Sequence, residues 1–185
     1  MAKFSDKIDE KIRKFIGEQK IFFTASAANE GRVNLSPKGI DTFRVLDEQT
    51  VCYLDLTGSG NETAAHLKEN GRLTIMFCSL AGAPLILRLY GKGETVHRSS
   101  EKWNELAALF DDFAGTRQII VLRVESLQTS CGFGIPLYEY QEDRTKLIEW
   151  AENKGDEGIN AYWREKNQTS IDGLPTGILN SEENN

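Results

Sequence analysis

The sequence predicts a mainly β protein of the α+β class, an antiparallel barrel with helices on its periphery. Runs rich in β-branched and aromatic residues, which are typical of strands, occupy residues 20–27, 32–36, 51–56, 73–78, 85–91 and 118–125. Asn29-Glu30-Gly31 joins the first two runs as a hairpin turn. Stretches with helical periodicity lie before, between and after the runs. We therefore expect a meander of strands that helices cover from outside.

Helical periodicity predicts five peripheral helices. They span residues 5–19, 62–70, 99–113, 142–153 and 157–166. Ser5 or Asp6 is expected to cap the first helix. The third helix carries an apolar stripe that is typical of core packing, formed by Trp103, Leu106, Ala107, Phe110 and Phe113. Residues 170–178 keep apolar side chains and should dock on the barrel, whereas residues 179–185 should be disordered.

The composition limits the class of protein. A chain of 185 residues, 39% of them hydrophobic, is long enough for one domain with a buried core. Its formal net charge of −6, without a basic stripe, argues against nucleic acid as a partner. We expect neither a signal peptide nor a membrane partner, because no long uncharged apolar run is present. Three cysteines cannot all pair, and Cys52 and Cys78 lie in apolar strands, so we expect reduced thiols and a cytoplasmic protein.

A polar turn after the strand at residues 51–56 is the first candidate binding element. Thr57-Gly58-Ser59-Gly60-Asn61 leads into the helix at residues 62–70, which Gly71 should terminate. Free N–H groups at such a helix start can bind an anion, most often a phosphate. The same residues also make an ordinary helix start, with Ser59 or Asn61 as the cap and Glu62 in the first turn. The turn alone leaves both interpretations open.

Two cations stand out from their surroundings. Lys38 follows Ser36 and Pro37 at the end of a predicted strand, where an exposed lysine is ordinarily only solvated. Arg88 lies in the middle of an apolar strand, where an uncompensated charge would cost several kcal/mol. Its compensating anion could be Asp55, Glu62 or a bound ligand.

Neither histidine lies in a sequence pattern that is typical of a catalytic or metal-binding residue. His66 and His97 are each isolated in the sequence, and we expect both to be partly exposed surface residues. The cysteines and histidines have no metal-ligand spacing, and no Ser-His-Asp set can be assigned. The sequence therefore predicts no metal site and no acid–base residue.

Two segments, SPKG at residues 36–39 and GSGNETAAHL at residues 58–67, resemble the pyridoxamine 5'-phosphate oxidase-related, FMN-binding split-barrel family. The resemblance extends over about residues 10–130. It implies a six-stranded antiparallel split barrel that pairs into a homodimer with FMN in both interfaces. It also implies a division into a barrel core at residues 1–130 and a helical extension at residues 131–178, which packs on the barrel and closes the flavin site.

The resemblance also implies the site residues. Lys38 and Arg88 would face anionic parts of the cofactor, and a cation there favours the negative charge of a reduced flavin. Hydroxyl and amide groups of the turn and of the helix that follows would bind the phosphate. The backbone after the strand at residues 51–56 would face the flavin ring or the ribityl chain. The full set is Ser36, Lys38, Asp55, Leu56, Thr57, Gly58, Ser59, Asn61, Thr63 and Arg88.

Departures from the family pattern concern the substrate. The true oxidases carry Ser-Arg-Lys where this chain has Ser59-Gly60-Asn61, and an arginine where Val33 stands, with Arg32 beside it. Their C-terminal arginine also has no counterpart near Leu174-Pro175. We therefore expect an FMN-dependent oxidoreductase whose small substrate is not pyridoxamine 5'-phosphate. The alternative is a non-catalytic protein that binds or senses flavin or haem. A third possibility, use of a deazaflavin, would require a more basic groove than this acidic chain offers.

Overall fold

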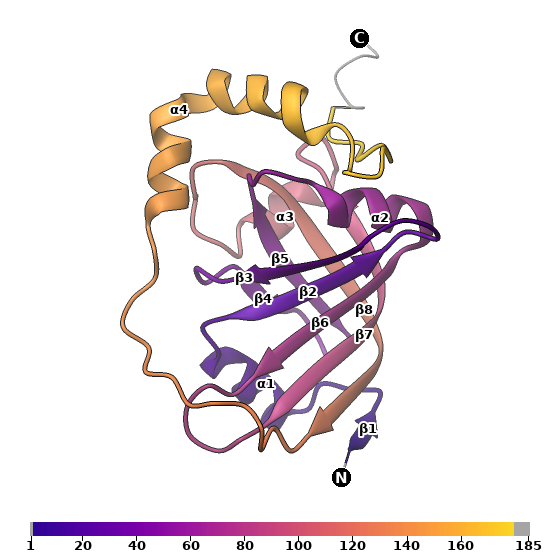
Figure 1. Cartoon of the computed structure of the whole chain (residues 1–185), viewed down its shortest axis with the longest axis vertical. Coiled ribbons are helices and arrows are strands. Elements are labelled where there is room, and N and C mark those ends of the chain that lie inside the picture. Colours follow the sequence, from indigo (N-terminus) through magenta and orange to yellow (C-terminus); the bar gives the residue numbers. More distant parts are fainter. Residues whose placement is uncertain (1, 180–185) are drawn as a thin grey trace.

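The computed structural model describes residues 2–179 of the chain, which form a barrel with helices at both ends (Figure 1). Its strands are β1 (Lys3–Ser5), β2 (Phe22–Ala27), β3 (Val33–Lys38), β4 (Phe43–Val45), β5 (Thr50–Leu56), β6 (Arg72–Cys78), β7 (Ile86–Val96) and β8 (Thr116–Ser130). Its helices are α1 (Glu10–Glu18), α2 (Glu62–Asn70), α3 (Trp103–Ala107) and α4 (Lys146–Tyr162), with the π-helical turn η1 (Trp163–Asn167) after α4.

All strands belong to one antiparallel sheet. Its order is β3-β2-β6-β7-β8-β5-β4, with β1 added beside β8. Within residues 2–179 no ladder joins β3 to β4, so the barrel stays open between these two edges. The predicted split barrel is confirmed. Residues 2–179 form eight strands instead of six, because the three-residue strands β1 and β4 add to the barrel.

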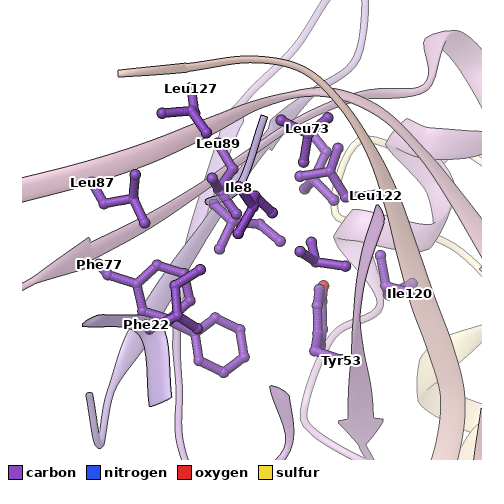
Figure 2. Close-up of a cluster of buried hydrophobic side chains, with 14 of the residues drawn as sticks. Ile8, Phe22, Tyr53, Leu73, Phe77, Leu87, Leu89, Ile120, Leu122 and Leu127 are labelled. Atoms are coloured by element: carbon purple, nitrogen blue, oxygen red, sulfur yellow. The ribbon is translucent and has the colours of Figure 1, made fainter. Parts of the chain in front are cut away.

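Side chains alternate between the two faces of each strand, and the apolar ones fill the barrel. Ile75, Leu87, Leu89, Ile120 and Leu122 are completely buried. They come from β6, β7 and β8 and belong to one cluster with Phe22, Tyr53 and Phe77. Figure 2 shows Leu87, Leu89, Ile120 and Leu122 around the same interior as these aromatic residues. Successive strand residues face opposite sides of a sheet, so the residues between them form the outer face.

Strand β5 is buried on both of its faces. Val51 and Tyr53 pack inside the barrel, whereas Cys52 and Leu54 pack against α3 and the segment that follows it. This explains the continuous apolar run, because a strand covered on both sides has no solvent-facing positions. Burial raises the pKa of the Cys52 thiol to about 12. The thiol is therefore neutral at physiological pH, as expected for a structural cysteine.

The first helix starts later than expected. Asp9 caps α1 by accepting the Ile12 N–H at 2.8 Å. Ser5 belongs instead to β1, where it pairs with Leu127 of β8. The capping assignment to Ser5 or Asp6 was wrong, because pairing with β8 holds this part of the chain in an extended conformation.

Helix α2 has the predicted bounds, and Gly71 ends it in the left-handed conformation. His66 is nevertheless only 1% exposed, contrary to the expected surface position. Its Nδ1 lies 3.0 Å from the Ser26 hydroxyl of β2. The helix lies closely against the barrel and buries the consecutive residues 63–67, among them the polar Thr63 and His66, which the weak apolar periodicity of the segment could not indicate.

The predicted helix at residues 99–113 is much shorter in the structure. Only Trp103–Ala107 is α-helical, and tight turns follow in which Leu109 and Phe110 donate to carbonyls three residues back. Phe110 and Phe113 still pack with Leu106 against β5 and β8. The prediction that these apolar residues pack in the core is confirmed, but turns instead of a continuous helix bring them to the sheet.

The C-terminal segment lies at the end of the barrel where α2 lies (Figure 1). Helix α4 has a break at Gly155, whose φ of 63° and ψ of 173° separate two helical parts, close to the two helices predicted. Beyond η1, Thr169 and Pro175 form a β-bridge, and Ile178 is buried beside Trp163. Leu179 packs against the same cluster. The rest of the predicted disordered tail, residues 180–185, lies outside the described residues.

No helix within residues 2–179 combines the length and the apolar composition needed to cross a membrane.

We predict that Gly91→Ala destabilises the protein by about 2 kcal/mol or more. A Cβ at Gly91 would lie 1.9 Å from the Arg123 carbonyl oxygen, at the point where the β7–β8 register shifts. Urea unfolding at neutral pH measures the effect. Gly134→Ala is the matched control, because nothing lies within 4 Å of its added methyl group. Equal stability of the two variants would contradict the tight approach of β7 and β8.

Candidate functional site

Three strand ends meet around one buried carboxylate. Lys38 ends β3, and its Nζ lies 2.7 Å from Asp55 Oδ1 near the end of β5. Arg117, at the start of β8, donates to Asp55 Oδ2 from Nη2 at 2.7 Å and from Nε at 3.2 Å. The cluster therefore ties together three segments that are far apart in the sequence.

An irregularity in the sheet explains why two neighbouring residues of β8 contact the same carboxylate. Asp55 pairs with Gln118, but the next residue, Leu56, pairs with Thr116, so Arg117 is an extra residue opposite β5. Such a bulge turns a side chain that would otherwise face the opposite side of the sheet. Gln118 Nε2 consequently also reaches Asp55 Oδ2, at 2.8 Å.

The electrostatics of the cluster leave an excess of positive charge. Burial alone would raise the pKa of Asp55, but the Arg117 and Lys38 cations outweigh it and hold this pKa well below its usual value. Asp55 is therefore ionised and neutralises only one of the two cations. The Arg117 side chain is 3% exposed and that of Lys38 is 24% exposed. Within residues 2–179 neither cation has a second carboxylate partner.

The turn after β5 is held by groups from other parts of the chain. Thr57 Oγ1 donates to the Gly115 carbonyl at 2.7 Å and accepts the Trp163 Nε1–H at 2.9 Å. Asn167 Nδ2 donates to the Gly58 carbonyl at 3.2 Å, and Arg117 Nη1 donates to the Gly60 carbonyl at 2.9 Å. The Gly58 and Gly60 carbonyl groups thus face the protein.

The interpretation of the turn as an ordinary helix start holds for the positions of its residues, with Glu62 in the first turn of α2, but not for the capping hydrogen bond. Asn61 occupies the capping position of α2, but its side chain makes no capping hydrogen bond, because its Oδ1 accepts from Gln118 Nε2 at 2.7 Å. Ser59 is exposed. Within the described part of the chain, the backbone N–H groups of Ser59, Gly60 and Asn61 have no protein acceptor. The N–H groups of Ser59 and Gly60 remain available to a ligand, whereas Asn61 is only 2% exposed.

Three of the predicted site residues lie beside this cluster without joining it. The Thr63 hydroxyl accepts from Asn34 Nδ2 at 3.1 Å, and the Ser36 hydroxyl donates to Asn34 Oδ1 at 3.1 Å. These contacts form a polar layer between β3 and α2. Leu56 packs in the apolar cluster under α3. The structure therefore brings Lys38, Asp55 and the turn at residues 57–61 together, with Ser36 and Thr63 next to them.

Arg88 lies apart from these residues. It is directly opposite Met76 of β6 and Gln128 of β8, in a row on the outer face of the sheet. Its Nη1 donates to the Ser130 hydroxyl at 3.3 Å. Neither expected carboxylate compensates it, because Asp55 binds Lys38 and Arg117, while Glu62 accepts the Ile171 N–H. Strand alternation places Arg88 on the side opposite the buried Leu87 and Leu89.

Two hollows flank the cluster. Lys38, Gly39 and Ile40 line a wide groove of about 1940 Å³ between α1, residues 78–85 and the segment at residues 138–147. A smaller pocket of about 380 Å³ lies on the Ser59 side of the turn, where Thr57, Gly58 and Ser59 face Leu147, Trp150, Lys154 and Tyr162. In this second pocket, Lys154 Nζ lies 5.4 Å from the Trp150 ring centroid.

Comparison with known proteins identifies the family. The pyridoxamine 5'-phosphate oxidase family model matches residues 8–131. The pyridoxamine 5'-phosphate oxidase family protein ustO of Aspergillus flavus is 35% identical over 195 residues, covering 95% of this chain and 78% of that protein. The chain belongs to the pyridoxamine 5'-phosphate oxidase family.

Solved structures show the same fold at low sequence identity. A HupZ variant from Group A Streptococcus superposes with a TM-score of 0.55 at 19% identity, over 66% of this chain and 99% of that one. An FMN-binding protein from Syntrophomonas wolfei superposes with a TM-score of 0.50 at 16% identity, over 64% of this chain and 82% of that one. Both cover about two thirds of this chain.

Four residues of the cluster escaped the sequence analysis. Arg117 and Gln118 lie within the family match, and a polar pair at the start of an apolar strand was the available signal. Trp163 and Asn167 lie beyond the match, in a segment expected to pack on the barrel without assigned contacts. No local pattern could pair them with Thr57 and Gly58, since more than 100 residues separate them.

We predict that Asp55→Asn lowers the free energy of unfolding by about 3 kcal/mol or more at neutral pH, because it leaves Arg117 buried without a counter-charge. Chemical unfolding measures this loss. The exposed pair of Glu94 and Lys102 provides the control, since Glu94→Gln should change stability by less than about 1 kcal/mol.

The same variant should also alter the pH dependence of stability. The folded-state pKa of Asp55 lies below the reference value of 3.8, so its ionisation stabilises the wild type above that pH. This stabilisation is lost as the pH falls from 3.8 toward the lower folded-state pKa. Unfolding measured at a series of pH values should show a shallower acid limb for Asp55→Asn. An unchanged acid limb would contradict the assignment of an ionised Asp55.

Proposed function

We propose that the chain binds FMN at the Lys38–Asp55–Arg117 cluster and the adjoining turn, and that it acts as an FMN-dependent oxidoreductase. Family membership and the similar fold of an FMN-binding protein support this proposal. The observation that carries it is a buried cluster with one excess positive charge, next to backbone N–H groups that have no acceptor among residues 2–179. Both features favour an anionic ligand.

The charge balance fits a phosphorylated cofactor. Burying a cation without a counter-charge is costly, and a nearby anion offsets that cost. Glu62 brings a negative charge to the first turn of α2, but its carboxylate is engaged with the Ile171 N–H. A phosphate at the turn would meet the Ser59 hydroxyl and the free N–H groups, with Arg117 behind the Gly60 carbonyl. This assigns Ser59, Asn61 and the turn backbone to the phosphate.

Lys38 has a second role in this proposal. It is the most exposed member of the cluster and also lines the wide groove. FMN supplies hydride chemistry at the N5 atom of its ring when bound. The Lys38 cation would stabilise negative charge on the cofactor. The protein would otherwise hold the cofactor in position and shape the site around it. Within residues 2–179 no side chain of the cluster is arranged as an acid–base pair, so we assign none.

The proposed substrate is a small molecule other than pyridoxamine 5'-phosphate. The turn of this chain has no cation of its own, and the segment around Leu174 and Pro175 has no arginine that could bind a second phosphate. Steady-state turnover with NADH or NADPH and an electron acceptor tests for enzyme activity. Flavin binding without turnover would favour the alternative, a non-catalytic flavin carrier or sensor.

We also propose that two copies of the chain pair through the outer face of β2 and β3. Val33 and Leu35 of β3 are 75% and 65% exposed, although both are apolar. They lie directly opposite Ala27 and Ala25 of β2, so an apolar surface extends across both strands. Apolar surfaces of this kind on a sheet are typical of protein interfaces. Arg88 lies on the same outer face, which would bring it to the interface.

We predict that Lys38→Ala combined with Ser59→Ala abolishes the yellow flavin absorbance of the purified protein. The double substitution removes the exposed cation of the cluster and the hydroxyl of the turn. Visible absorbance before and after addition of FMN measures cofactor content. Lys68→Ala combined with Ser99→Ala is the control, because both residues are exposed and neither belongs to the turn or to the charged cluster. Undiminished flavin content in the Lys38 and Ser59 variant would refute the proposed site.

We predict that Leu35→Glu converts the homodimer into a monomer, because it places a charge in the proposed apolar interface. Sedimentation velocity measures the change in mass. Leu137→Glu serves as the control, since Leu137 is also exposed but lies on the segment between β8 and α4. A wild-type protein that sediments as a monomer would rule out the proposed pairing.

A further inference from the structure

The C-terminal segment, residues 146–179, contacts the turn at residues 57–61 from a part of the chain that the family match does not include. Asn167 is completely buried and uses both ends of its side-chain amide. Its Nδ2 donates to the Gly58 carbonyl at 3.2 Å, and its Oδ1 accepts from Arg117 Nη1 at 2.9 Å. Asn167 therefore links the turn to the charged cluster.

These contacts fix the direction of the peptide groups in the turn. In a planar trans peptide, the N–H of one residue points away from the carbonyl of the residue before it. The described backbone contains no cis peptide bonds. Because Asn167 holds the Gly58 carbonyl, the Ser59 N–H points away from Asn167. Because Arg117 holds the Gly60 carbonyl, the Asn61 N–H points away from Arg117.

The same segment also forms a wall of the small pocket beside the turn. Trp150 and Tyr162, on the two sides of the break at Gly155, pack with their ring centroids 5.2 Å apart. Lys154 lies between them in sequence, and its Nζ is 5.4 Å and 5.7 Å from the two ring centroids. Ser59 lines this pocket from the opposite side. An anion bound at Ser59 would thus lie close to an ammonium group of the C-terminal segment.

We propose that Asn167 is a positioning residue that gives this protein its preference for a phosphorylated flavin over an unphosphorylated one. The proposal rests on the proposed function, because it assumes that the turn binds the phosphate. Asn167 does not contact the ligand. It orients the Gly58 carbonyl and, through the shared peptide plane, the Ser59 N–H that binds the phosphate. The C-terminal segment therefore determines cofactor selectivity from outside the family core.

Asn167→Ala tests this role. Without the amide, the Gly58 carbonyl loses its donor and the Ser59 N–H loses its fixed direction. We expect the Kd for FMN to rise about tenfold, as for the loss of one hydrogen bond to a charged group. The Kd for riboflavin, which has no phosphate, should change by less than about twofold. Titrations of the full-length protein with each flavin, followed by flavin fluorescence, measure both constants.

Gln168→Ala is the matched control, because it removes a side-chain amide one residue further on. Gln168 is exposed, and its Nε2 donates only within its own helical turn, to the Arg164 carbonyl at 2.6 Å. Its two dissociation constants should equal those of the wild type. A purely structural role for Asn167 would weaken binding of both flavins equally. Equal weakening, or no change in either constant, would overturn the proposal.

Flavin binding by the wild type distinguishes a failure of this inference from a failure of the proposed function. A wild type that binds neither flavin refutes the proposed function and this inference with it. A wild type that binds both flavins equally well refutes only the inference.

If Asn167→Ala does not fold, Trp163→Phe provides a second variant, since it removes the donor to Thr57 Oγ1 and keeps an aromatic ring. It should lower the FMN preference in the same direction, and an unchanged preference counts against the proposal.

Discussion

The Asp55 carboxylate is the constraint on which the rest of the site depends. It lies near the end of β5, is only 3% exposed, and binds Lys38 on one side and Arg117 on the other. A buried carboxylate is stable only with such partners, and these partners join the ends of β3, β5 and β8. The geometry of the neighbouring turn follows from the same network, because Arg117 also holds the Gly60 carbonyl and the Asn167 side chain.

The network needs an irregular sheet. In a regular ladder, Arg117 and Gln118 would face opposite sides, and only one of them could reach Asp55. The shift between Asp55 and Leu56 brings both to the same carboxylate. A similar shift occurs at Gly91, where β7 and β8 approach too closely for a side chain. Of these two irregularities, the one at Asp55 and Leu56 lies where polar side chains converge, and the one at Gly91 lies where two backbones approach closely.

The positive charge near the turn comes from residues outside the turn itself. Where the resemblance to the true oxidases implies two cations in the turn itself, this chain has glycine and asparagine there. The structure instead places cations behind the turn, at Lys38 and Arg117, and beside it, at Lys154. An anion at the turn would therefore meet backbone N–H groups first, with the charge acting from behind and from the C-terminal segment. In the proposed site, ligand selectivity would then depend on how rigidly the turn is held.

The sequence by itself determined the barrel, helix α2, the turn before it and the family, because these depend on local periodicity, turn chemistry and short motifs. It also indicated Lys38 at a strand end. Only the tertiary structure decided which groups meet: the pairing of Lys38 with Asp55, the burial of His66, the separation of Arg88 onto the outer face, and the contacts of Trp163 and Asn167. These depend on a bulge and on contacts between residues from 17 to 109 positions apart in the chain, which leave no periodic signal in the sequence.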